Sequence, residues 1–215
     1  RGKLNKIAKD TNSFLKRFIS KQKKTNLIVA MKYGLFSGGK KIRSKILIDV
    51  GSLFKFDYKT LIIIGAAVEC IHAYSLIHDD LPCMDDDSIR RGKPSTHIKY
   101  GEASAVLAGN SLLTLAFEII ADKNYLINSN SKNEIIKSLA FCSGHTGIAG
   151  GQELDLKFEN KKKKLKQIIN MQRKKTGKLF NFCLYAVGVL AKKNTKEKNF
   201  LSLLGEEIGL LFQFA

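Results

Sequence analysis

The stretch from Leu61 to Leu81 reads LIIIGAAVECIHAYSLIHDDL and is apolar on nearly every side. A helix without a polar face belongs in the middle of a helical bundle. Short Ile-rich strands are the alternative for residues 61–64, but the length of the run and the lack of a flanking turn favour a helix. A second segment of this kind, SAVLAGNSLLTLAFEIIA, covers residues 104–121. The two segments predict an all-α fold.

Amphipathic patterns predict further helices around these two. After Gly38 and Gly39, apolar residues recur at helical spacing from Ile42 to Phe54, with basic residues between them. Other helices are expected at residues 133–143, 165–191 and 197–214, with polar loops at 124–132 and 160–164. The chain has only 2 prolines and no repeat or flexible linker, which argues against a loop-rich β-sandwich. We therefore expect residues 1–215 to form a single all-α domain, a helical bundle.

Composition restricts the class of partner. The sequence has 37 Lys and Arg against 19 Asp and Glu, a net charge of +18, which favours an anionic partner such as nucleic acid, a membrane surface or phosphorylated metabolites. Its four cysteines lie far apart without a CxxC pair, so a zinc ribbon or disulfide framework is not indicated and a reducing cytoplasm is expected. No segment reaches the roughly 18 uncharged apolar residues typical of a membrane span, so none is expected.

The first apolar stretch leads into HDDLPCMDDDSIRRGKP, residues 78–94, in which five aspartates fall within nine positions. A helix C-terminus disfavours anions, and Pro82 must end or distort the helix. Water could solvate such a run, but its place between a buried helix and Arg90-Arg91 favours a bound ligand. An EF-hand counted from Asp80 would put an arginine where Glu is required. Because Mg²⁺ takes one or two carboxylates with substrate phosphates, and arginine binds phosphate in bidentate fashion, we predict a magnesium-bridged diphosphate.

Weaker signals elsewhere have the same chemistry. The segment GGKKIR (38–43) places flexible residues before a basic helix start, so that backbone N–H groups and cations could point at one anion, although it is not a nucleotide P-loop. His72 lies two helical turns before Asp79 on the same face, although a single His is commonly a core residue. The turn at 174–178 contains cations and a hydroxyl that suit an anion, but a solvated turn explains it equally well. Gln213 is an amide in an apolar helix, and a buried amide with its hydrogen bonds satisfied explains it equally well.

Six segments, in order along the chain, resemble the isoprenyl diphosphate synthase family, most closely its bacterial farnesyl diphosphate synthases. They are GGKKIR (38–43), ECIHAYSLIHDDLPCMDDDSIRRGKPSTH (69–97), GEASAVLAGNSLLTLAFEI (101–119), GGQELDL (150–156), KKTGKL (174–179) and GEEIGLLFQFA (205–215). A DDxxxxD run followed by RRG is seldom found outside this family. The resemblance implies an all-α bundle of ten or more helices around a deep cavity, a homodimer, and Mg²⁺ as cofactor.

The resemblance also implies roles for individual residues. The metal ligands that hold Mg²⁺ against the allylic diphosphate would be Asp79, Asp80 and Asp85, and Arg90 would contact the same diphosphate. The pocket for the diphosphate of isopentenyl diphosphate would comprise Lys40, Arg43, His72 and Arg91. The reacting centre would be lined by Lys175, Thr176 and Gln213, which count with the three aspartates as catalytic residues.

Product length depends on what closes the cavity. Tyr74 lies five residues before Asp79, about 7.5 Å deeper along a helix, with Ser75 beside it. A large ring there would floor the cavity after a short product, and in the resembling family this placement goes with fifteen carbons; a Tyr merely packed in the core is the alternative. The expected activity is condensation of isopentenyl diphosphate with dimethylallyl or geranyl diphosphate to farnesyl diphosphate. A geranyl or geranylgeranyl diphosphate synthase is the alternative.

Two other classes share parts of the pattern. A terpene cyclase has the fold and an aspartate-rich motif but needs no second diphosphate site, so GGKKIR and RRG favour chain elongation. A nucleic-acid-binding module is motivated only by the charge, and five clustered aspartates would repel phosphate without metal, so no nucleic acid is expected as partner. In the resembling family a second motif, DDxxD, follows the FQ pair, where this sequence ends at Ala215. We therefore expect the sequence to be an incomplete view of a longer enzyme.

Overall fold

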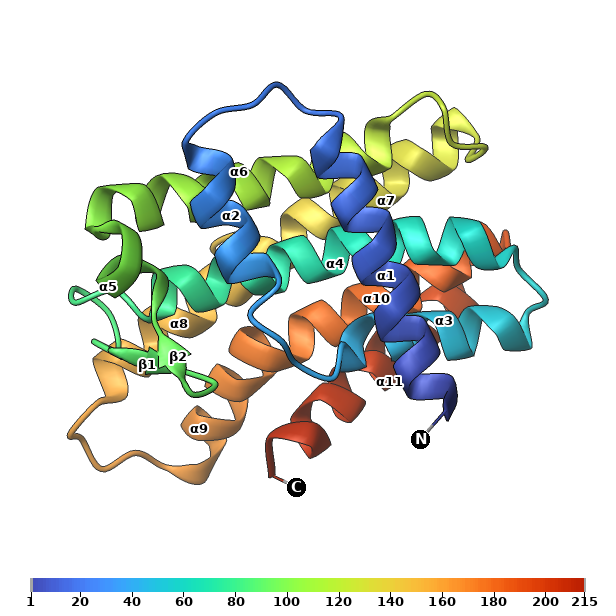
Figure 1. Ribbon diagram of the computed structural model, residues 1–215. Coiled ribbons are helices and arrows are strands. Elements are labelled where there is room, and N and C mark those ends of the chain that lie inside the picture. Colours follow the sequence, from blue (N-terminus) through green and yellow to red (C-terminus); the bar gives the residue numbers. More distant parts are fainter. Residues whose placement is uncertain (1, 215) are drawn as a thin grey trace. The chain divides into compact units, whose positions relative to one another are not determined.

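A computed structural model describes residues 2–214, without the side chains of residues 3 and 4, and is almost entirely helical (Figure 1). The helices are α1 (Gly2–Ser20), α2 (Leu27–Leu35), α3 (Ile42–Leu53), α4 (Tyr58–Asp79), α5 (Thr96–Tyr100), α6 (Glu102–Ala121), α7 (Ser129–Ser143), α8 (Ile148–Phe158), α9 (Leu165–Gln172), the π-helical turn η1 (Arg173–Gly177), α10 (Lys178–Leu190) and α11 (Thr195–Phe214). A short hairpin consists of β1 (Ile89–Arg90) and β2 (Lys93–Pro94). The all-α prediction is confirmed.

The chain divides into two compact units. The first comprises Arg1–Lys45 and Ile62–Asp122, and the second comprises Ile46–Leu61 and Lys123–Ala215. Helices α3 and α4 therefore contribute to both units. The aspartate run and GGKKIR belong to the first unit, whereas the turn at 174–178 belongs to the second.

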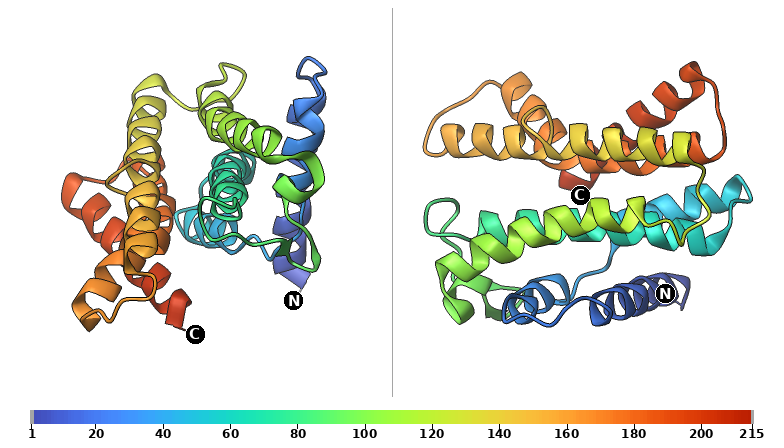
Figure 2. Two further views of the ribbon diagram at one scale, coloured as in Figure 1. Left: turned by 90° about the vertical axis from the view of Figure 1, so that its left-hand side faces the viewer. Right: turned by 90° about the horizontal axis from the view of Figure 1, so that it is seen from above.

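Helix α4 forms the core of the first unit. Asp57 caps its N-terminus, because Asp57 Oδ2 accepts the backbone N–H of Thr60 at 2.8 Å. The helix is buried on every side from Thr60 to Ile71 and ends at Asp79, before Pro82, as the sequence predicts. Helix α6 runs alongside α4, and α1 and α2 cross over both (Figure 2).

Two glycines permit close approach of helices to α4. A Cβ on Gly34 of α2 would lie 2.4 Å from Ile77 Cδ1. A Cβ on Gly109 of α6 would lie 2.2 Å from His78 Nε2, which is 3.0 Å from the carbonyl oxygen of Val106. The last turn of α4, which ends at Asp79, is thus held by α2 and α6.

Helices α4 and α6 are both long and apolar enough to cross a membrane, which the sequence analysis did not anticipate. In α4, 83% of the most apolar window is buried, as in the core helix of a globular protein, whereas in α6 the share is 44%. Helix α6 keeps apolar side chains at its surface, with Val106 38% and Leu107 54% exposed.

The hairpin was not predicted. Ile89 pairs with Pro94 and Arg90 with Lys93, so two residues form the turn. These are Arg91 and Gly92, with φ of 54° and 74°, the left-handed geometry of a tight hairpin turn. Strands of two residues are too short for an alternating pattern to show in the sequence.

Helix α10 is the most buried helix of the second unit, and α7 and α11 pack against it. Small residues bring α11 close. A Cβ on Gly205 would lie 2.4 Å from the carbonyl oxygen of Phe180, and one on Gly209 would lie 2.8 Å from the Cα of Gly177. The GEEIG spacing of α11 thus serves helix packing.

Several boundaries differ from the prediction. Residues 129–132, expected in a loop, start α7, because Asn128 Oδ1 accepts the Ser131 N–H at 2.9 Å and caps the helix. The helix expected at 165–191 is interrupted by the π-helical η1. Helices α1, α2, α5 and α8 were not assigned from the sequence; in α8, two glycines lower the intrinsic helix propensity.

Candidate active site

The three candidate metal ligands come from one short segment of the first unit. Asp79 is the last residue of α4 and Asp80 follows it. The backbone N–H of Asp85 donates to the Asp79 carbonyl oxygen at 2.9 Å, and that of Asp86 to Leu81 at 3.2 Å. This loop returns the main chain of Asp85 to the end of α4, so the DDxxxxD spacing brings its outer residues together.

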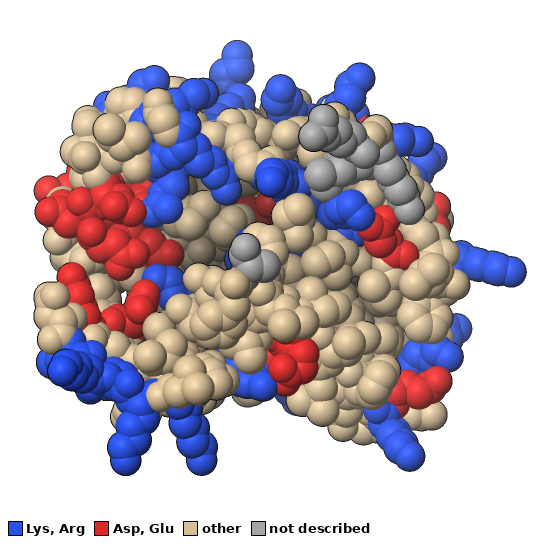
Figure 3. Space-filling model, turned by 90° about the horizontal axis from the view of Figure 1, so that it is seen from below, with Lys and Arg blue, Asp and Glu red and all other residues tan. Residues whose placement is uncertain are grey.

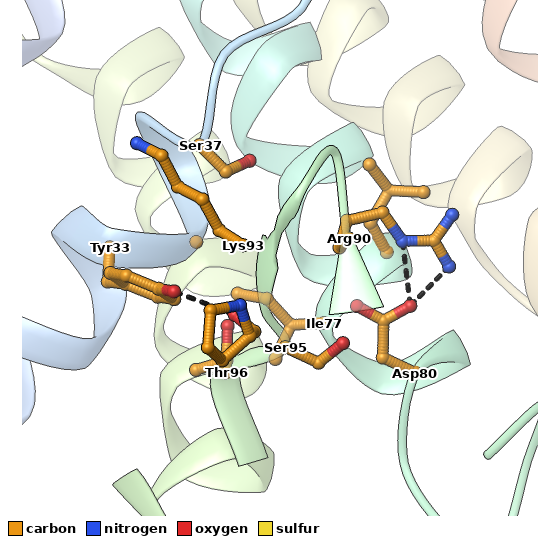
Figure 4. A pocket seen from close by; sticks show the side chains of 11 residues that line it. Tyr33, Ser37, Ile77, Asp80, Arg90, Lys93, Ser95 and Thr96 are labelled. Carbon is orange, nitrogen blue, oxygen red and sulfur yellow. Dashed lines mark hydrogen bonds and ion pairs between the residues drawn. The ribbon is translucent and has the colours of Figure 1, made fainter. Parts of the chain in front are cut away.

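Asp80 is 3% exposed and its charge is neutralised by Arg90 of the hairpin. Arg90 Nε lies 2.8 Å from Asp80 Oδ1, Arg90 Nη2 also contacts this oxygen, and Nη2 reaches Asp87 Oδ2 at 2.9 Å. The hydrogen bond to Asp80 raises the pKa of Arg90 above its ordinary value. Figure 4 shows the Asp80 carboxylate facing the guanidinium. The predicted metal ligand and the predicted diphosphate ligand are therefore neighbours.

Contacts on the opposite side hold the hairpin to α2. The Tyr33 hydroxyl of α2 donates to the carbonyl oxygen of Pro94 at 2.7 Å (Figure 4). Ser95 Oγ donates to the Asp87 carbonyl oxygen at 2.5 Å and joins the two ends of the hairpin. The cavity between these groups is about 20 Å³, room for about one water molecule. It is too small for a diphosphate and is part of the packing that orients Arg90.

His72 lies on α4 among four cationic side chains. Burial lowers its pKa well below the ordinary value, and the positive charges of Arg43, Lys41, Arg91 and Arg90 lower it further. The imidazole is therefore neutral at physiological pH. Three of the four residues expected to bind isopentenyl diphosphate, namely Arg43, His72 and Arg91, are thus brought within electrostatic range of one another.

Lys40, the fourth, is exposed on the loop before α3. This loop requires its glycines, because Gly38 and Gly39 have φ of 104° and 103°. Arg91 donates to the Gly38 carbonyl oxygen, and a Cβ on Gly39 would lie 2.5 Å from Arg91 Nη1. Because the two glycines have no side chains, the Arg91 guanidinium can pack directly on the loop backbone.

The N-terminus of α3 differs from the expectation that its free N–H groups point at an anion. The N–H of Ser44 donates to Glu69 Oε1 at 3.3 Å, so a carboxylate of this chain already occupies that position. Lys41 Nζ lies 3.4 Å from Glu69 Oε2, and the two residues are 8% and 2% exposed. This pair was not predicted from the sequence, although a carboxylate inside an otherwise apolar helix was a usable signal.

Tyr74 and Ser75 occupy the face of α4 behind the aspartates. Tyr74 is 8% exposed and packs edge-on against His78, with ring centroids 5.7 Å apart. Burial, and secondarily the charge of Asp79, raise the pKa of Tyr74, so its hydroxyl stays protonated. Ser75 Oγ donates to the carbonyl oxygen of His72 at 3.0 Å, within its own helix. Their role in product length stays a prediction.

The remaining candidates form a second cluster, in the second unit. Lys175 Nζ lies 2.5 Å from Asp155 Oδ2, and Thr176 Oγ1 donates to Gln213 Oε1 at 3.0 Å. Thr176 is buried, whereas Gln213 is exposed, which corrects the alternative of a buried amide. Asp155 was missed, although it lies in the quoted GGQELDL segment.

Lys175 and Thr176 both lie in the π-helical turn η1, a deformation found often at functional sites. Helix α8 approaches this turn at Gly151, where a Cβ would lie 2.2 Å from the backbone N of Lys175. The glycine therefore allows Asp155, one turn further along α8, to reach Lys175.

Basic residues are spread over the surface. On the face drawn in Figure 3, Lys and Arg side chains project mostly one by one, whereas acidic side chains gather in a few patches. The run Lys161–Lys164 lies in a polar, mostly exposed loop. Much of the +18 charge thus belongs to solvated lysines.

Residues 24–215 match the protein family described as Polyprenyl synthetase. The chain belongs to this family. It is 42% identical to the farnesyl diphosphate synthase of Escherichia coli (strain K12) over 215 residues, which are 98% of this chain and 72% of that relative. The farnesyl diphosphate synthase of Bacillus subtilis (strain 168) is 40% identical over 185 residues, 86% of this chain and 62% of the relative.

Solved structures of the family have the same fold. An FPP/GFPP synthase from Zymomonas mobilis, in its apo form, superposes with a TM-score of 0.92 at 38% identity, covering 98% of this chain and 77% of that one. A geranyltranstransferase from Thermotoga maritima superposes with a TM-score of 0.85 at 31% identity, covering 98% and 76%. The resemblance carried by the six sequence segments is confirmed.

Proposed function

We propose that this protein is a prenyltransferase that condenses isopentenyl diphosphate with dimethylallyl or geranyl diphosphate and releases farnesyl diphosphate. The observation that carries the proposal is that the first unit holds two separate groups of side chains with the chemistry of diphosphate ligands. One combines the aspartates with Arg90, and the other combines His72 with Arg43 and Arg91. A cyclase acting on one diphosphate needs only the first. The relatives named farnesyl diphosphate synthase support the fifteen-carbon product. The structure from Zymomonas mobilis is named an FPP/GFPP synthase, which supports a longer product as the alternative.

The carboxylates fit a metal that the substrate helps to hold. Among residues 2–214, as far as their side chains are described, no group of three His, Cys, Asp or Glu side chains is arranged to hold a metal ion alone. Mg²⁺ commonly takes one or two carboxylates and completes its shell with phosphate oxygens and water. We assign Asp79, Asp80 and Asp85 as its ligands. When bound, the ion would neutralise charge on the leaving diphosphate as a Lewis acid.

Protein side chains perform the remaining steps. Arg90, prealigned by Asp80 and Asp87, binds oxygens of the allylic diphosphate, and the allylic C–O bond breaks with its electron pair going to that diphosphate. Neutral His72 donates a hydrogen bond to isopentenyl diphosphate beside Arg43 and Arg91. The double bond of that substrate attacks the allylic carbon, a C–C bond forms, and the proton lost goes to the released pyrophosphate. No side-chain nucleophile is required.

The second cluster would stabilise the cation formed in this step. We assign Lys175, Thr176 and Gln213 to the reacting centre, with Asp155 as the residue that orients Lys175. Thr176 Oγ1 and the Gln213 amide are dipoles held by their mutual hydrogen bond, which suits stabilisation of charge without a nucleophile. The Tyr74 ring would close the bottom of the expected product cavity and limit the length of the product.

We also propose that residues 1–215 form one domain of a cytoplasmic homodimer, with no membrane span and no nucleic acid as partner. The exposed apolar residues of α6, Val106 and Leu107, supply a surface that a second copy would bury. None of the four cysteines forms a disulfide, as is typical of proteins in a reducing compartment.

Substitution of Asp79 by Asn tests the function. The rate of product formation by the full-length variant should fall about 10²-fold or more, because the bound metal stabilises charge on the leaving diphosphate in the transition state. The matched control, Asp122→Asn at the end of α6, should keep wild-type activity. Equal activity of Asp79→Asn and wild type would overturn the proposal.

A further inference from the structure

We propose that Lys41 and Glu69 are a positioning pair that sets affinity for isopentenyl diphosphate without touching it, an inference that rests on the function proposed above. Neither residue belongs to the expected binding set. Lys41 is the last residue of the loop that carries Lys40, Glu69 lies on α4, and both are buried, at 8% and 2% exposure.

The pair fixes the end of the loop from inside. Lys41 has a φ of 49°, a left-handed conformation that a non-glycine residue adopts only when its surroundings hold it. Its ammonium lies 3.4 Å from Glu69 Oε2 and 3.4 Å from the carbonyl oxygen of Leu35, the last residue of α2. These contacts direct the Lys41 side chain inward while its neighbour Lys40 is exposed to solvent.

Glu69 also fixes the start of α3. Its Oε1 accepts the backbone N–H of Ser44 at 3.3 Å and lies 2.9 Å from Ser44 Oγ. A carboxylate at this place caps the helix and favours its positive end. Arg43, one residue earlier, is thereby held in the first turn of α3, and His72 follows Glu69 by three residues on the same face of α4.

Outside the loop, Arg91 packs against Gly38 and Gly39. The loop is therefore held by the buried Lys41–Glu69 pair, and the Arg91 guanidinium of the hairpin packs on its glycines. Because the lysine cancels the charge of Glu69, the anion site keeps the full charge of Lys40, Arg43 and Arg91. Loss of the pair would misplace these three cations together.

The sign of one substitution separates positioning from simple electrostatics. Glu69→Leu removes a negative charge close to an anion site, so electrostatics alone would tighten isopentenyl diphosphate binding. Positioning predicts the reverse, a rise of about tenfold or more in KM for isopentenyl diphosphate. Glu69→Gln, which keeps an acceptor for Ser44, should show a smaller rise. An unchanged or lower KM in Glu69→Leu would overturn the proposal.

A second variant guards against loss of folding, because removal of one partner leaves the other buried and unpaired. Lys41→Met/Glu69→Leu removes both charges and should keep a wild-type circular dichroism spectrum. Its KM for isopentenyl diphosphate should still rise about tenfold, while KM for geranyl diphosphate and kcat change less than about threefold. The conservative Lys41→Arg should keep most of the affinity. Equal rises in both KM values would show a merely structural role and overturn the proposal.

The control is another ion pair, Lys198 with Glu134 in the second unit, which is more exposed and has Nζ and Oε1 2.5 Å apart. Lys198→Met/Glu134→Leu should change neither KM. Calorimetric titration of the full-length protein with isopentenyl diphosphate alone measures binding independently of turnover. If wild type binds and forms no product, the proposed function fails; if wild type forms product and the Lys41/Glu69 double variant binds with unchanged Kd, the positioning role fails.

Discussion

Replacement of Gly151 by Ala has two opposite effects on stability, because alanine favours the helix but its Cβ collides with a neighbouring turn. Alanine is about 1 kcal/mol more favourable than glycine inside a helix, so α8 considered alone would be stabilised. The added Cβ, however, would lie 2.2 Å from the backbone N and 2.5 Å from the Cα of Lys175. Backbone atoms cannot rotate away as a side-chain tip can, so α8 and η1 must separate. Such overpacking costs about 1–3 kcal/mol, and contact with backbone favours the upper end.

The net effect is a destabilisation of about 2 kcal/mol, which corresponds to a fall of about 4–8 °C in Tm for a domain of this size. Thermal unfolding followed by circular dichroism at 222 nm measures it. Because the shift displaces Lys175 from Asp155, kcat should fall as well. Gly2→Ala, where a Cβ meets nothing within 4 Å, is the control; Gly2 is the first residue of α1, and the substitution should not lower Tm. A Tm of Gly151→Ala at or above that of wild type would refute the packing argument.

Three further predictions follow from single side chains. Tyr74→Ala should lengthen the product beyond fifteen carbons, as measured by mass spectrometry, and an unchanged distribution would remove Tyr74 from chain-length control. Arg90→Lys cannot reproduce the guanidinium fork and should raise KM for the allylic substrate by about tenfold or more, with KM for isopentenyl diphosphate unchanged; equal changes in both would contradict the assignment. Because the folded-state pKa of His72 is depressed below its ordinary 6.5, the unfolded chain binds more protons, so stability is lost as pH falls below about 6.5. Urea unfolding at pH 5 and 7 should therefore show a smaller pH effect in His72→Gln than in wild type, and equal effects would refute it.

Local pattern was sufficient for the large helices. The apolar runs that start near Leu61 and Ser104 are helices α4 and α6, and Pro82 lies just past the end of α4, because burial on every side and proline geometry act within a few residues. Elements that depend on distant contacts were missed. Helix α8 contains glycines that weaken its propensity, yet Gly151 is needed for approach to η1, which is distant in sequence.

The site shows the same division. Asp79, Asp80 and Asp85 were selected from a single DDxxxxD motif, and one loop returns the main chain of Asp85 to Asp79. The partner of Asp80 was assigned to the substrate alone, and only the fold shows that Arg90 also binds the carboxylate. Glu69 was not selected because its function depends on the N-terminus of α3, a different helix. Sequence spacing thus finds residues that act within one segment, whereas ion pairs between segments require the structure.

The proposed function requires that this protein join two diphosphate substrates. Mass spectrometry of products tests this after the full-length protein is incubated with isopentenyl diphosphate and geranyl diphosphate, together and separately, with Mg²⁺ or with EDTA. A fifteen-carbon diphosphate is expected only when both substrates and Mg²⁺ are present. Formation of a cyclic hydrocarbon from geranyl diphosphate alone, or no product with both substrates and Mg²⁺, would contradict it.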